Sequence, residues 1–247
     1  MAITTTAEIA QRLTANSSML PTHATDANIA VGSASLDAIA GNGGACNIAI
    51  GKSALSAATD NCDNIAIGQS ALAASVNDGD NNIAIGQTAM GGADVSGINN
   101  IAIGKTTMDA LTTGLCNIAL GINSLGASTT GCANVAIGVQ ALGVGVVGGS
   151  TGEGAGNVAI GWNAADAVTT GGGNIALGTN AYGAGTTGLR NIAIGETALG
   201  GAATTGVDNI AIGKNTADAL IGAACNIALG TNALGAMTVG TDNIAIG

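Results

Sequence analysis

The sequence predicts an all-β fold, a parallel β-solenoid (β-roll) of about 13 coils. Three observations lead to it: the pentad Asn-Ile-Ala-Ile-Gly recurs 13 times with conservative changes, most copies are 17 or 18 residues apart, and large side chains are scarce. The chain has 42 Gly, one Trp, one Tyr and no Phe. Compact cores usually take much of their buried area from aromatic side chains. We therefore expect a thin core that is repeated many times.

Each pentad begins with an asparagine, and the asparagines give the phase of the repeat. They are separated by 17 to 19 residues, except for one interval of 23 residues. The repeat domain is expected to span residues 28–247, after a separate segment at 1–27. The asparagines are Asn28, Asn47, Asn64, Asn82, Asn100, Asn117, Asn134, Asn157, Asn174, Asn191, Asn209, Asn226 and Asn243.

Within the pentad, large branched residues alternate with alanine, which is the period-2 pattern of a short strand. Successive strand side chains point to opposite faces. We expect the large residues to fill the interior as a core ladder and the alanines to point outward. The asparagines are expected to stack as an amide ladder at a corner. The representative core positions are Ile48, Ile50, Ile65, Ile67, Ile210 and Ile212, and the representative ladder positions are Asn47, Asn64 and Asn209.

A second apolar element, such as Ala54-Leu55, follows each pentad and is predicted to be a second short strand. Recurrent Thr-Thr-Gly turns, such as Thr129-Thr130-Gly131, close the coil. Glycine supplies the positive φ of a tight corner, and the hydroxyl groups can bond the local backbone. One coil is therefore expected to contain two strands and two corners.

The outward alanines predict an assembly. A methyl-only stripe along the whole rod is typical of an interface, so we expect identical rods to pack side by side, most simply as a homotrimer. The representative positions of this inter-subunit stripe are Ala49, Ala66, Ala84, Ala102 and Ala211.

Charge and motif content exclude several classes of function. Fifteen acidic and five basic residues give a net charge of −10, which disfavours nucleic-acid binding. No catalytic constellation, cofactor motif or metal-ligand spacing emerges, and enzymatic activity is not expected. An aspartate column at Asp37, Asp109, Asp166 and Asp218 is interpreted as a corner type and not as a calcium site. No run is long enough to insert into a membrane, and no Sec signal is visible.

Two regions outside the regular repeat are candidates for specific contacts. Residues 1–27 include a capping box at Thr5 and Glu8, which predicts a short helix that either attaches the chain to a particle base or caps the roll. The expanded coil is either a contact loop or a tolerated insertion. The candidate loop contacts are Gly149, Ser150, Thr151, Glu153 and the single tryptophan, Trp162.

The repeated Ile/Val-Ala-Ile-Gly followed by an Ala-rich element resembles the head repeat of the trimeric autotransporter adhesins (YadA-like heads). The longer unit at residues 191–206 is similar to repeats of bacteriophage tail fibres, and the resemblance covers residues 28–247. It implies a left-handed parallel β-roll that assembles as a trimer. Autotransporters need a Sec signal and a membrane anchor, which the sequence does not display, so the phage-type branch is favoured.

The predicted function is a structural one. We expect a trimeric shaft of a phage tail fibre or similar adhesive appendage, located on a virion or outside the cell. Its partners would be further copies of itself, a virion or appendage base at the N-terminus, and a host receptor or glycan. One alternative is a self-assembling head-to-tail extracellular filament, suggested by the uncapped terminal coil. The least favoured alternative is an ice-binding solenoid, suggested by the threonine pairs that recur along the repeats.

Overall fold

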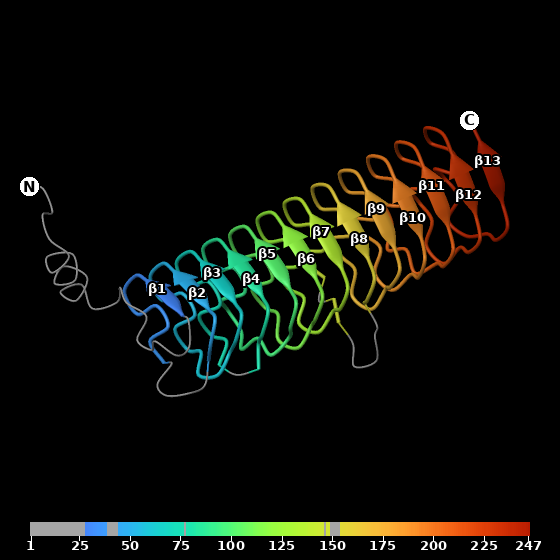
Figure 1. Cartoon of the computed structure of the whole chain (residues 1–247). Helices are drawn as coiled ribbons and strands as arrows, with labels where there is room; N and C mark the ends of the chain where they lie inside the picture. The colour runs from blue at the N-terminus through green and yellow to red at the C-terminus, as the bar shows by residue number, and fades with distance from the viewer. Residues whose placement is uncertain (1–27, 39–43, 77, 146, 149–153) are drawn as a thin grey trace, which may run out of the picture.

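The computed structural model describes residues 28–38, 44–76, 78–145, 147–148 and 154–247. Within these residues the chain forms a parallel β-solenoid and contains no helix. Thirteen three-residue strands follow one another along one axis, so that the molecule is a rod with a single sheet on one face (Figure 1). We number each coil by its strand. The predicted N-terminal helix lies outside the described residues.

The strands coincide with the central three residues of the pentads. They are β1 (Ile29–Val31), β2 (Ile48–Ile50), β3 (Ile65–Ile67), β4 (Ile83–Ile85), β5 (Ile101–Ile103), β6 (Ile118–Leu120), β7 (Val135–Ile137), β8 (Val158–Ile160), β9 (Ile175–Leu177), β10 (Ile192–Ile194), β11 (Ile210–Ile212), β12 (Ile227–Leu229) and β13 (Ile244–Ile246).

The strands of adjacent coils pair in parallel along the whole sheet, without any shift in register. Ala49 of β2 lies beside Ala66 of β3, and the large residues on either side pair in the same way. The ladder continues beyond the strand ends, because the Ile48 amide donates to the Asn64 carbonyl at 2.8 Å and the Gly68 amide donates to the Ile50 carbonyl at 2.7 Å. The repeat length therefore sets the register: one period along the chain is one step along the rod.

The structure reverses the expected orientation of the strand side chains. The proposed stripe residues Ala49, Ala66, Ala84, Ala102 and Ala211 are all fully buried, with 0% exposure. The proposed core residues face outward instead: Ile50 and Ile212 are 38% and 40% exposed, and Ile48, Ile65, Ile67 and Ile210 are partly exposed. The core ladder is thus made of alanine.

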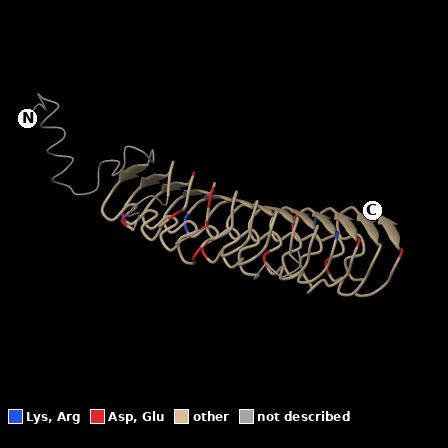
Figure 2. Ribbon diagram, turned by 60° about the horizontal axis from the view of Figure 1, so that its bottom comes forward, with Lys and Arg blue, Asp and Glu red and all other residues tan. Residues whose placement is uncertain are grey.

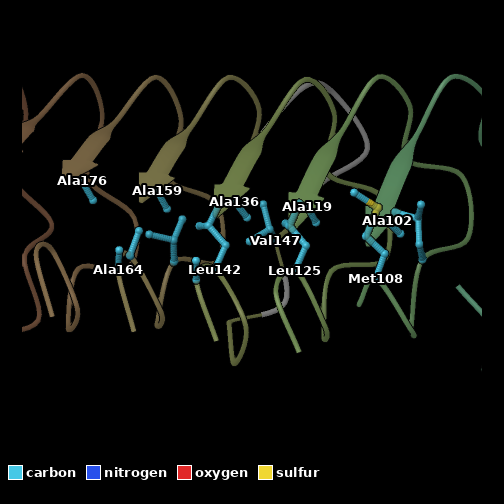
Figure 3. Packing of buried hydrophobic residues seen from close by; sticks show 14 of the residues in the cluster. Ala102, Met108, Ala119, Leu125, Ala136, Leu142, Val147, Ala159, Ala164 and Ala176 are labelled. Atoms are coloured by element: carbon cyan, nitrogen blue, oxygen red, sulfur yellow. The ribbon is translucent and has the colours of Figure 1, made fainter. Parts of the chain in front are cut away.

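The opposite wall of the coil explains this reversal. Large side chains such as Leu125 and Leu142 project from it toward the strands, and the strand alanines point back at them (Figure 3). Both leucines are buried, at 1% and 0% exposure. Because one wall already supplies the bulk, the interior has room only for a methyl group on the strand side, and protein interiors are close-packed.

The predicted second strand is wrong for the described residues, in which each coil has a single strand and a run of turns. The turns alternate in backbone conformation, and both Ser53 (φ 55°) and Leu55 (φ 51°) are left-handed. This backbone still bonds the neighbouring coils: Ser53 donates to the Ser33 carbonyl at 2.8 Å, and Leu55 donates to the Ala71 carbonyl at 2.9 Å. The left-handed residues bend the chain back while Leu55 stays buried.

The glycine that ends each pentad is required by both conformation and space. Gly121 has φ of 129°, a region that side-chain-bearing residues rarely adopt. A Cβ at this position would lie 2.5 Å from the carbonyl oxygen of Gly138 in the next coil. The stacking of backbone on backbone therefore requires glycine in this column.

In coils 8, 9 and 11, buried residues three positions apart compensate one another in size. Where the leucine column contains Ala165 or Ala217, the residue three positions later is the larger Val168 or Leu220, and these residues are at most 1% exposed. Tyr182 is the opposite case, because Gly185 follows it at the same spacing. These three coils therefore combine one larger and one smaller residue, whereas coil 5 buries both Met108 and Leu111.

Candidate interaction surface

The outer face of the sheet carries an unbroken apolar surface, which we call the aliphatic stripe. It consists of the first and third residues of each strand from β1 to β13, all of them Ile, Val or Leu. Thirteen coils at about 4.8 Å each make the stripe roughly 60 Å long. No strand carries a charged residue, as the uniformly tan strands of Figure 2 show.

This stripe is larger and more apolar than the alanine stripe that the sequence led us to expect. Branched side chains project from it, and ten of the stripe residues count among the exposed large hydrophobic residues of the described chain. Contiguous exposed apolar patches of this extent mark interfaces, since a free monomer would keep them in contact with water at a cost. The interface prediction thus moves from the alanine column to the isoleucine columns.

The asparagine ladder fixes one edge of this surface. Asn47 Oδ1 accepts from the backbone N–H of Asn64 at 3.0 Å and from its Nδ2 at 3.2 Å. The Nδ2 of Asn47 in turn donates to the Asn61 carbonyl at 2.6 Å. The backbone bond recurs from Asn28 to Asn243, and Asn209 is joined to Asn191 in the same way. The ladder therefore keeps adjacent coils at a constant separation along the rod axis.

Of the candidate loop contacts, only Trp162 lies within the described residues. Gly149, Ser150, Thr151 and Glu153 lie outside the described residues. Trp162 is 58% exposed and directly follows Gly161, just beyond the end of β8. Its backbone carbonyl accepts a hydrogen bond from the backbone N–H of Asn180 at 2.9 Å, so that only the indole projects from the rod.

Two ion pairs join coils 10 and 11, and we did not identify them from the sequence. The Arg190 Nε donates to Asp208 Oδ1 at 2.7 Å and its Nη2 donates to Oδ2 at 2.8 Å, which is a two-bond fork. Lys214 Nζ lies 3.0 Å from Glu196 Oε2. The guanidinium lowers the pKa of Asp208 through hydrogen bonding and charge. The sequence contains a signal for both pairs, because the two partners of each pair occupy the same position in successive repeats. Arg190 and Asp208 each precede a repeat asparagine, and Glu196 and Lys214 each follow a pentad glycine.

The four residues of the aspartate column lie in the runs of turns that follow the strands. Burial raises the pKa of Asp109 and Asp166, while hydrogen bonds from the backbone of Gly92 and Val144 act in the opposite direction. Among the described residues, no group of three or more His, Cys, Asp or Glu side chains is arranged to hold a metal ion.

The one tyrosine is part of the interior. Tyr182 is fully buried, and its hydroxyl oxygen accepts from Asn191 Nδ2 at 3.3 Å. Burial raises the pKa of Tyr182 to about 12. A neutral phenol with these contacts stabilises coil 9.

Comparison of the chain with protein-family models, with curated proteins and with solved structures gives no match. Over the residues that the structure describes, no helix has the length and apolar character needed to cross a membrane. The aliphatic stripe is therefore the surface on which we base the functional proposal.

Proposed function

We propose that this chain is a structural fibre protein, in which identical β-solenoids pack side by side through the aliphatic stripe, as a homotrimer. The observation that carries the proposal is the outward position of two branched side chains on every one of the 13 strands. A rod of this form serves as a shaft of a phage tail fibre or similar adhesive appendage, which projects a binding end away from its base.

Three copies are the simplest closed arrangement. Each rod has one flat apolar face, and three such faces around a common axis bury all three stripes at once. Two rods placed face to face would also cover the stripes. Sedimentation of the purified protein distinguishes the two cases, and a stable monomer at micromolar concentration would overturn the proposal.

A pair of variants tests whether the stripe is the contact. Ile137 in β7 is 37% exposed, and Ile137→Asp would place a carboxylate in the interface without entering the core of its own coil. Burying an unpaired charge costs several kcal/mol, so this variant should remain folded but sediment as a monomer. Thr113→Asp changes an exposed residue in a turn and serves as the control, which should assemble normally.

A further inference from the structure

Two columns of exposed or partly exposed residues flank the strands that carry the aliphatic stripe. The leading column is the residue before each asparagine, and the trailing column is the residue after each pentad glycine. For coils 2 to 12 the leading column is Cys46, Asp63, Asn81, Asn99, Cys116, Ala133, Gly156, Gly173, Arg190, Asp208 and Cys225. The trailing column is Lys52, Gln69, Gln87, Lys105, Ile122, Val139, Trp162, Thr179, Glu196, Lys214 and Thr231.

In two adjacent coils the two columns carry opposite charges, whereas Lys52, Asp63 and Lys105 in coils 2, 3 and 5 have uncharged counterparts. In coil 10 Arg190 leads and Glu196 trails, and in coil 11 Asp208 leads and Lys214 trails. These are two oppositely charged pairs in a chain with only 8% charged residues. In coils 6 to 8 neither column contains a charge, and the large trailing Trp162 has Gly156 as its counterpart.

Within one chain, the opposite charges of the two columns do not pair with each other. The two columns lie at opposite ends of each strand, six residues apart along the chain, and neither of the two ion pairs of coils 10 and 11 joins Glu196 to Arg190. The ion pairs of one chain run along the columns instead: Arg190 bonds Asp208 at 2.7 Å, and Lys214 lies 3.0 Å from Glu196. Each column thus presents one positive and one negative charge at adjacent levels, in opposite order.

We propose that the trailing column of one copy docks against the leading column of the next copy at the same level. This inference rests on the proposed side-by-side assembly. Three flat faces around an axis meet at three corners, and each corner brings one edge of a stripe against the opposite edge of its neighbour's stripe. At coils 10 and 11 the four charges then form a checkerboard, in which Glu196 faces the neighbouring copy's Arg190 and Lys214 faces its Asp208.

The checkerboard fixes the axial register of the copies. The aliphatic stripe repeats at every coil and would tolerate slippage by one coil, about 4.8 Å. A slip in one direction places Glu196 against the neighbouring copy's Asp208, and a slip in the other places Lys214 against its Arg190. Like charges in contact disfavour both alternatives.

The same docking covers the single tryptophan. Trp162 is 58% exposed on the isolated chain, and in the docked state its ring lies over the side-chain-free position of the neighbouring copy's Gly156. Assembly should therefore shift the tryptophan emission to shorter wavelength and protect it from acrylamide quenching. This signal reports on the corner and is independent of the ion pairs.

The decisive variant exchanges the charges of one column. E196K/K214E keeps the net charge and leaves an oppositely charged pair within the chain, so the isolated coil should be unaffected. In register, however, it places like charges at two levels of each of three corners. Exposed ion pairs contribute about 1.5- to 5-fold each, so the trimer dissociation constant should rise on the order of a hundredfold at low salt. High salt should reduce this effect.

The second exchange, R190D/D208R, should have the same effect alone and should restore assembly when it is combined with the first. Lys52→Glu is the control, because Lys52 faces an uncharged leading residue, Cys46, and should assemble as the wild type does. Analytical ultracentrifugation and Trp162 emission are the two measurements. Restored assembly and a shielded Trp162 in the fourfold variant support the inference.

Two outcomes separate the inference from the proposed function. A trimeric wild type whose E196K/K214E variant assembles equally well, or whose fourfold variant is no better than either double variant, would overturn the docking of the columns and leave the fibre proposal standing. A monomeric wild type would overturn both.

Discussion

Replacing Gly185 by alanine should destabilise coil 9 because it would place a methyl group inside the ring of Tyr182. A Cβ at Gly185 would lie 2.3 Å from Tyr182 Cζ and 2.4 Å from its Cε1, where van der Waals contact needs at least 3.4 Å. The ring has little space in which to retreat. It is fully buried, and its hydroxyl is held by Asn191 and lies against Gly188, where a Cβ would also clash at 2.3 Å.

The magnitude follows from the size of the overlap. Inserting atoms into a packed core costs about 1 to 3 kcal/mol, and a clash of more than 1 Å belongs at the upper end of this range. Gly→Ala on its own would stabilise by about 0.4 to 1 kcal/mol through the unfolded chain. We expect a net loss of about 2 kcal/mol. The pair Leu55 and Ala58 in coil 2 shows that leucine and alanine fit at the same spacing, so Y182L/G185A should recover most of the loss that G185A suffers.

The assay is urea unfolding followed by circular dichroism, with Trp162 in the adjacent coil as a local probe. The matched control is Gly222→Ala, since a Cβ at Gly222 would meet nothing within 4 Å. The free-energy coupling between positions 182 and 185 should exceed about 1 kcal/mol. If G185A is as harmless as G222A, or if the two substitutions at 182 and 185 are additive, the packing argument is refuted.

Three further predictions concern the ladder, the phenol and the glycine column. Asn117→Ala removes an acceptor for the backbone N–H of Asn134 (3.0 Å) in a buried ladder and should cost about 3 kcal/mol in urea unfolding; an unchanged midpoint would contradict the ladder's role. Because the pKa of Tyr182 is raised to about 12, the unfolded chain ionises first above pH 10, so the stability advantage of the wild type over Y182F should fall by about 2 kcal/mol between pH 9 and pH 11.5. A pH-independent difference would exclude a neutral buried phenol. Gly121→Ala should lower the unfolding midpoint more than any of these, because its Cβ would meet the Gly138 carbonyl oxygen at 2.5 Å and backbone cannot move aside cheaply; normal stability would show that the coils can separate locally.

The interaction surface was only partly predictable, and the partial failure has a clear origin. The alternation of Ile48, Ala49 and Ile50 indicates that the two kinds of side chain face opposite ways, but it is silent on which way is inward. The usual preference for large residues inside favoured isoleucine. The complementary charges in coils 10 and 11 became meaningful only when the columns were known to flank one exposed face.

The sequence by itself determined the periodic features of this protein: the number of coils, the position of each strand and the stacking of equivalent residues. These follow from local chemistry, because a branched strand of three residues ends at a glycine and recurs with a nearly constant period. Only the tertiary structure decided which face is inside. The outcome depends on the facing wall, where Leu125 and its equivalents already fill the coil, so that the strand can contribute no more than the methyl group of Ala119. The isoleucines are left on the outer face of the rod.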